Sequence, residues 1–114
     1  MLTQIPFDHE LLIKLDRRIR RLNNLMNGRQ EGTNKYYEYK RTLKAKTHER
    51  HLLIWRYMTE LCKVFLTEQV GTPSLEDFIR LGLVDPRDRI LKTLIEVNEG
   101  MIPNVLEKLT CLKD

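Results

Sequence analysis

The sequence predicts an all-α fold: an antiparallel helical hairpin with one long helix at about 33–71, followed by a cap of three short C-terminal helices. Three observations support this prediction. The stretch between Gly32 and Gly71 contains no proline or glycine and is rich in residues that favour helices. Apolar residues recur at spacings of three and four. No segment shows the alternating pattern of a strand or the turn signal of a β-hairpin.

The first helix is expected to begin near Pro6, because proline suits the first helical position. Asp8 and Glu10 would then lie in its first turn, where carboxylates stabilise the positive end of the helix dipole. We expect the helix to end at Gly28, and the short link to Gly32 predicts an antiparallel return. An apolar row follows the helix at heptad-like spacing: Leu12, Leu15, Ile19, Leu22 and Met26.

The long helix offers a polar partner to this apolar row. At the same spacing its first half presents Tyr36, Lys40, Leu43, Thr47 and Arg50, and only from Ile54 onward are these positions mostly apolar. Two covers for the leucine row therefore remain open, the long helix itself and a second copy of the chain. Because of the mismatch we expect a homo-oligomer whose seam is this row.

Three short helices are expected after Gly71. Ser74 and Asp77 match a capping box at the start of the first, which should stop at Gly82. Asp85 and Pro86 suit the N-cap and first position of the second, which should end at Gly100, and Pro103 should open the third. These helices should surround Trp55, Met58, Cys62 and Phe65. We expect a single domain over 1–114, with a basic hairpin arm at about 6–50 and a helical head at about 51–114.

Charge is distributed unevenly along the chain. The formal net charge is +4, yet residues 14–50 contain twelve Lys or Arg against four Asp or Glu, a net charge of +8. Residues 51–114 contain eight against ten, a net charge of −2. Positive charge confined to one third of the chain indicates a polyanionic or acidic partner.

Several classes of function are disfavoured by the sequence. His48 and His51 are three residues apart, whereas the helical zinc protease motif needs two histidines four apart so that both reach one metal, and no metal site is expected. The glycines do not form a phosphate-binding loop, and Cys62 has no nearby base in sequence, so we expect neither a cofactor nor an enzyme. Cys62 and Cys111 are expected to be reduced, which favours an intracellular setting, cytoplasmic or nuclear. We expect no signal peptide and no membrane span.

The basic rows of the hairpin are the candidate binding site. The first helix contributes a row on the side away from its leucines, formed by Lys14, Arg17 and Arg21 and flanked by Arg18 and Arg20. The long helix contributes Tyr37, Arg41 and Lys44 on one face, with Lys40 and Lys46 in support. An antiparallel hairpin is expected to bring the two rows within one Debye length, about 8–10 Å, so that their fields add.

The sequence thus predicts a non-catalytic accessory protein that binds the nucleic-acid phosphate backbone with little sequence preference. Tyr37 and its neighbouring tyrosines could stack on unpaired bases or, alternatively, serve only hairpin packing. The alternative function is a protein–protein interaction module, an adaptor or an inhibitor, that docks on an acidic or helical partner surface. A third interpretation is that the basic residues only solvate the hairpin.

Overall fold

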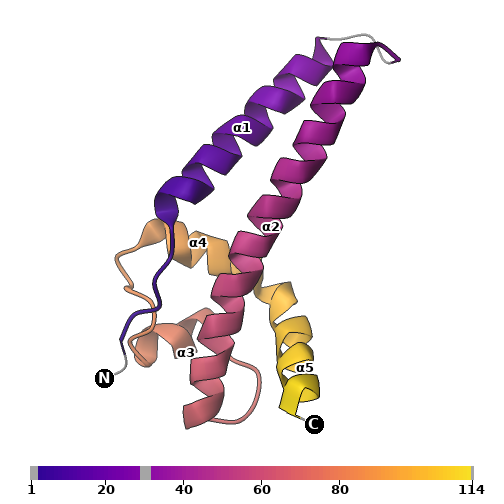
Figure 1. Ribbon diagram of the computed structural model, residues 1–114. Helices are drawn as coiled ribbons and strands as arrows, with labels where there is room; N and C mark the ends of the chain where they lie inside the picture. Colours follow the sequence, from indigo (N-terminus) through magenta and orange to yellow (C-terminus); the bar gives the residue numbers. More distant parts are fainter. Residues whose placement is uncertain (1–2, 29–31, 114) are drawn as a thin grey trace. The chain divides into compact units, whose positions relative to one another are not determined.

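The computed structural model describes residues 3–28 and 32–113, and every regular element within them is helical (Figure 1). The chain forms α1 (His9–Asn27), α2 (Asn34–Glu68), α3 (Leu75–Arg80), α4 (Arg89–Val97), the 3₁₀ helix η1 (Glu99–Met101) and α5 (Ile102–Lys113). The predicted all-α class is confirmed, as are the long helix paired with an N-terminal helix and the short C-terminal helices.

Two compact units divide the chain. The hairpin unit is Asp8–Ile54, and the second unit combines Met1–Phe7 with Trp55–Asp114. α2 contributes to both units, and its 35 residues give a length of about 52 Å at ~1.5 Å per residue. The single domain over 1–114, with its arm and head, stays a prediction.

The start of α1 differs from the prediction by a few residues. Asp8 is the N-cap rather than a first-turn residue, because its carboxylate accepts a hydrogen bond from the backbone N–H of Leu11 at 3.0 Å. Pro6 lies outside the helix, next to Ile5, whose backbone N–H donates to the carbonyl of Leu83 at 3.1 Å. The carboxylate cap therefore determines where α1 begins, and the proline precedes it.

α2 starts as predicted and ends slightly early. The Thr33 hydroxyl accepts a hydrogen bond from the N–H of Tyr36 at 3.2 Å, which satisfies a donor of the first turn. The helix ends at Glu68 instead of continuing to Gly71. Gly71 has φ of +113°, a conformation that glycine adopts without strain, and it redirects the chain three residues after the helix.

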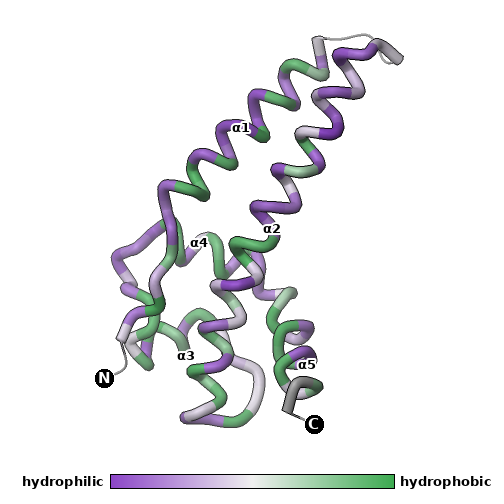
Figure 2. Tube along the Cα trace, in the orientation of Figure 1, coloured by the Kyte–Doolittle hydropathy of each residue, from purple (hydrophilic) through white to green (hydrophobic). Residues whose placement is uncertain are grey.

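The inner side of α2 in the hairpin unit follows a different register from the predicted seam. Tyr39 and Lys46 are half-buried, whereas the predicted seam residues Lys40 and Thr47 are exposed. Tyr39 brings apolar surface to the interior, and Lys46 can bury its aliphatic stem while its ammonium group stays in water. Figure 2 shows that hydrophilic residues still predominate over this part of α2.

The leucine row of α1 is largely covered within one chain. Leu12, Leu15 and Leu22 are 5%, 3% and 0% exposed, and Ile19 and Met26 are half-buried. Burial of this kind stabilises the folded chain by roughly 1.5–3 kcal/mol per leucine. The use of the row as an oligomer seam stays a prediction.

The second unit has its own apolar core. Met58, Cys62 and Phe65 of α2 are buried as predicted, and Trp55 is only half-buried. The short helices contribute further buried side chains, which are Leu75, Phe78, Leu91, Leu94, Ile95, Ile102, Val105 and Leu109. In Figure 2 hydrophobic residues accordingly recur along α4 and α5.

The short helices confirm some predicted caps and correct others. The Asp77 carboxylate accepts from the backbone N–H of Ser74 at 2.8 Å, as a capping box requires. Asp85 does not cap α4: it accepts from the N–H of Arg87 at 2.9 Å within a turn, and Asp88 is the N-cap instead. Gly100 does not end α4, which stops at Val97; it lies within η1.

Candidate nucleic-acid interface

Four cations form a strip along the exposed side of α1. Lys14, Arg17, Arg18 and Arg21 are all exposed, and their spacing of three, four and seven places them on one face of the helix. The opposite side of α1 carries the buried leucines and Asp16, whose carboxylate accepts a hydrogen bond from Arg50 of α2. This α1 strip therefore points away from α2.

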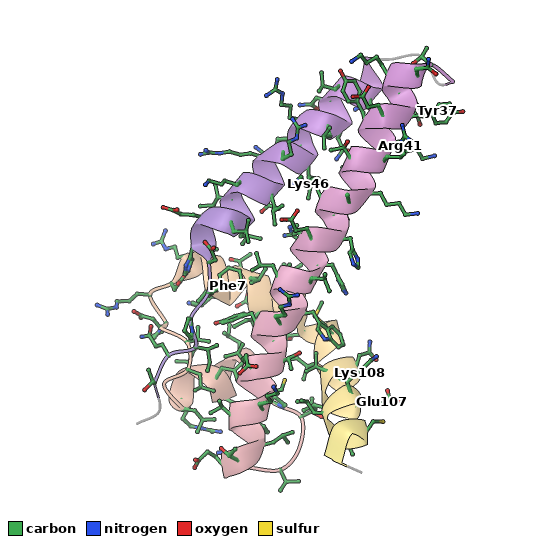
Figure 3. The ribbon with its side chains drawn as sticks, in the orientation of Figure 1. Phe7, Tyr37, Arg41, Lys46, Glu107 and Lys108 are labelled. Carbon is green, nitrogen blue, oxygen red and sulfur yellow. The ribbon has the colours of Figure 1, made fainter. Side chains whose placement is uncertain are left out.

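A second strip with the same spacing follows α2. Tyr37, Lys40, Arg41 and Lys44 are exposed and together line a shallow, open groove. Tyr37 is 49% exposed, and its ring meets the ring of Tyr36 edge-on, with centroids 5.7 Å apart. Figure 3 shows Tyr37 and Arg41 on the side of α2 away from α1. The α2 strip thus combines an accessible aromatic ring with three cations.

Three carboxylates of the hairpin unit pair with cations outside the two strips. Asp16 bonds Arg50, Glu38 lies 3.6 Å from the Lys35 ammonium, and Glu49 lies 3.3 Å from the Lys46 ammonium. Within the described residues no ion pair involves a member of either strip. Among the described residues of the hairpin unit, the cations of both strips are therefore left without a carboxylate in ion-pair contact.

Two of the predicted site residues lie off the strips. Lys46 is half-buried and forms an ion pair with Glu49 along α2. In Figure 3 it lies away from Tyr37 and Arg41. Arg20 is exposed, but its position in the helical repeat places it on another side of α1 from Arg18 and Arg21. Both can add to the field of the hairpin without belonging to a continuous binding row.

The structure does not bring the two basic rows together. Each strip lies on the outer side of its own helix, so the hairpin separates them. With a typical spacing of 8–10 Å between helix axes and helix diameters of 10–12 Å, the strips stand about 20 Å apart. This estimate exceeds the Debye length of ~8 Å at physiological salt, so we expect the field of each strip to act largely on its own.

An ion pair between the helices was not foreseen. The Arg50 Nε donates to Asp16 Oδ1 at 2.6 Å, and both side chains are partly exposed, at 36% and 42%. Arg50 lies on the predicted seam of α2, where a charged side chain is stabilised by an opposite charge. Asp16 and Arg50 lie equally far in sequence from Thr33, so a hairpin that turns there brings them level. That symmetry was the available signal.

Other kinds of site find little support in the described residues. No three His, Cys, Asp or Glu side chains there lie close enough together to hold a metal ion. The groove at α3 and α4 is lined by three glutamates and one lysine, Lys92, and this negative balance is unfavourable for a polyanion. None of the helices in the described ranges is long and apolar enough to cross a membrane. No protein-family model, curated protein or solved structure matches the chain.

Proposed function

We propose that this protein binds the phosphate backbone of nucleic acid, without catalysis and with little sequence preference. The observation that supports the proposal is the pair of exposed strips whose cations have no carboxylate partner among the described residues. Uncompensated cations on a rigid helix face attract phosphates and release the counterions that nucleic acid has condensed. Arginines in particular bind phosphate oxygens through paired N–H donors.

The α2 strip has dimensions that suit a nucleic-acid strand. From Tyr37 to Lys44 the helix rises about 10 Å, the axial length over which one strand of a duplex presents roughly three phosphates. Tyr37 adds a ring that can stack on an unpaired base or donate its hydroxyl hydrogen to a phosphate. Contacts of these kinds do not distinguish base sequences, which is why we propose non-specific binding.

The test is a titration of labelled single- and double-stranded DNA and RNA, followed by fluorescence anisotropy over a range of salt concentrations. Log affinity should fall with log salt by ~0.9 per phosphate neutralised on a duplex and by ~0.7 on a single strand. We expect the α2-strip variant, Lys40→Gln with Arg41→Gln and Lys44→Gln, to lower affinity and to make this slope shallower.

A matched control changes the same number of charges elsewhere. Arg56, Arg89 and Lys108 are exposed residues of the second unit, and replacing each with glutamine leaves both strips intact. This control variant should bind nearly as the wild type does, since its charges lie outside the strips. Absence of binding to all four nucleic acids at low salt would overturn the proposal and favour an acidic protein partner. Equal losses in the strip and control variants would contradict the assigned surface.

A further inference from the structure

The two strips repeat one arrangement on opposite edges of the hairpin unit. Positions 14, 17, 18 and 21 of α1 have the same spacing as positions 37, 40, 41 and 44 of α2. Each set covers two helical turns on a side that faces away from the partner helix. One unit therefore carries two basic surfaces that point in different directions.

Neither strip can complete the binding site of the other. A phosphate held by Arg41 on the outer side of α2 lies beyond the reach of Arg17, because α1 and α2 stand between them. Each strip has at least three cations, enough to hold a backbone segment weakly on its own. The arrangement is that of two separate polyanion sites, not of one enlarged site.

From this arrangement we infer that the hairpin binds two nucleic-acid segments at once, one along each edge, and so bridges them. The inference rests on the proposed function and extends it from binding to linking. Repulsion between the two bound segments does not prevent this, because over ~20 Å at a Debye length of ~8 Å their interaction is screened to roughly a tenth. Two sites on one rigid unit also hold a second segment more firmly when both belong to one long molecule.

Energy transfer between two short duplexes, one carrying a donor dye and one an acceptor, measures bridging directly. Anisotropy on the same samples measures binding. Wild-type protein should bind and produce energy transfer at low salt. The variant Arg17→Gln with Arg18→Gln and Arg21→Gln should still bind through the α2 strip, with affinity lowered less than tenfold, but should lose the transfer. The α2-strip variant should behave in the same way through α1.

The control variant, with Arg56, Arg89 and Lys108 changed to glutamine, should retain both signals. Circular dichroism would verify that every variant keeps its helical content, as expected for exposed changes to a residue of similar helix propensity. A measurement on unmodified protein is also available: sedimentation in excess duplex should give two duplexes per chain.

The outcomes separate the two proposals. If the wild type binds but gives no energy transfer and takes up one duplex per chain, the bridging inference is overturned and the proposed function stands. Bridging that survives in either single-strip variant would also overturn it, because a dimer using one strip per copy would then be the link. If the wild type binds no duplex at all, the proposed function itself fails.

Discussion

Replacing Tyr57 with phenylalanine should stabilise the protein. Tyr57 is 3% exposed, and its ring lies 4.8 Å from that of Phe7 at an angle of 55°. Its hydroxyl oxygen is buried and has no hydrogen-bond partner among the described residues. Phenylalanine keeps the ring and its packing against Phe7 and removes only the hydroxyl group.

The size of the effect follows from the cost of a buried polar group. A hydroxyl that leaves water without regaining a hydrogen bond costs about 1–3 kcal/mol. Loss of the hydroxyl leaves a gap too small to forfeit much packing energy. We therefore expect Tyr57→Phe to raise the free energy of unfolding by ~1 kcal/mol, which corresponds to roughly 4–8 °C in Tm for a unit of this size.

Urea unfolding followed by the fluorescence of Trp55 is a suitable assay, because this is the only tryptophan of the chain and belongs to the same unit as Tyr57. Tyr37→Phe is the matched control: its ring is exposed, so the free energy of unfolding should change by no more than about 0.5 kcal/mol. A loss of 1 kcal/mol or more in Tyr57→Phe would refute the reasoning, since it would mean that the hydroxyl is satisfied.

The pH dependence gives an independent check. Burial, and to a smaller extent the negative charge of Asp88, raises the pKa of Tyr57 above its ordinary value of 10.0. Above pH 10 the unfolded chain loses this proton while the folded chain keeps it, so the unfolded state binds fewer protons and stability falls as pH rises. Tyr57→Phe should therefore show a smaller loss of stability above pH 10 than the wild type.

Three further predictions concern other parts of the chain. Gly82→Ala should lower the free energy of unfolding by about 1 kcal/mol, because Gly82 has φ of +81° after α3. Gly100 has no positive φ and open space around it, so Gly100→Ala should leave the free energy of unfolding almost unchanged; urea unfolding measures both. In native protein, iodoacetamide should modify the exposed Cys111 well before the buried Cys62, because burial raises the pKa of the Cys62 thiol to about 11. Mass spectrometry after brief labelling measures the two modification rates, and equal rates would contradict the burial of Cys62. Tyr37→Ala should weaken binding to single strands by ~1–3 kcal/mol and leave duplex binding nearly unchanged, and equal losses in anisotropy titrations would argue against stacking.

The helices were predictable because local signals determine most of them. The long stretch without proline or glycine before Gly71 predicts α2, and the Ser74 capping box predicts the start of α3. The end of α3 also follows from sequence, since Gly82 donates its N–H to the carbonyl of Ile79 and Leu83 donates to Phe78, the bonds of a Schellman motif. In each case a residue and its near neighbours in sequence supply all the required bonds.

The predicted helix boundaries were wrong where two residues could serve the same role. Asp85 and Asp88 are both able to cap a helix, and only the turn around Pro86 decides that the second does so. Gly100 resembles a helix stop, yet it does not take the positive φ that makes glycine favourable there. The spacing rules allow either assignment, and they do not include the backbone conformation that the chain adopts at each position.

The prediction of which α2 residues face the inside of the hairpin was wrong for a related reason. Spacings of three and four both keep residues on one helix face, so the pattern starting at Tyr36 can continue through Tyr39 or through Lys40. Over the polar first half of α2 no run of leucines fixes the choice. The aromatic side chain of Tyr39 was a usable signal, because it offers more apolar surface to the interior than a lysine. Lys46 gave no such signal, since a lysine can be half-buried when only its aliphatic stem packs against the protein.

The relation between the basic rows was within reach of the sequence, although the prediction placed them together. The α1 row was assigned to the side away from the leucines, and the α2 residues Tyr37, Arg41 and Lys44 lie outside the seam of their helix. When two helices pair through their seams, rows on the far sides of both helices must point apart, whatever the packing details. An antiparallel hairpin therefore cannot concentrate such rows into one field. It separates them, and whether the second surface is used is what the two-duplex experiment decides.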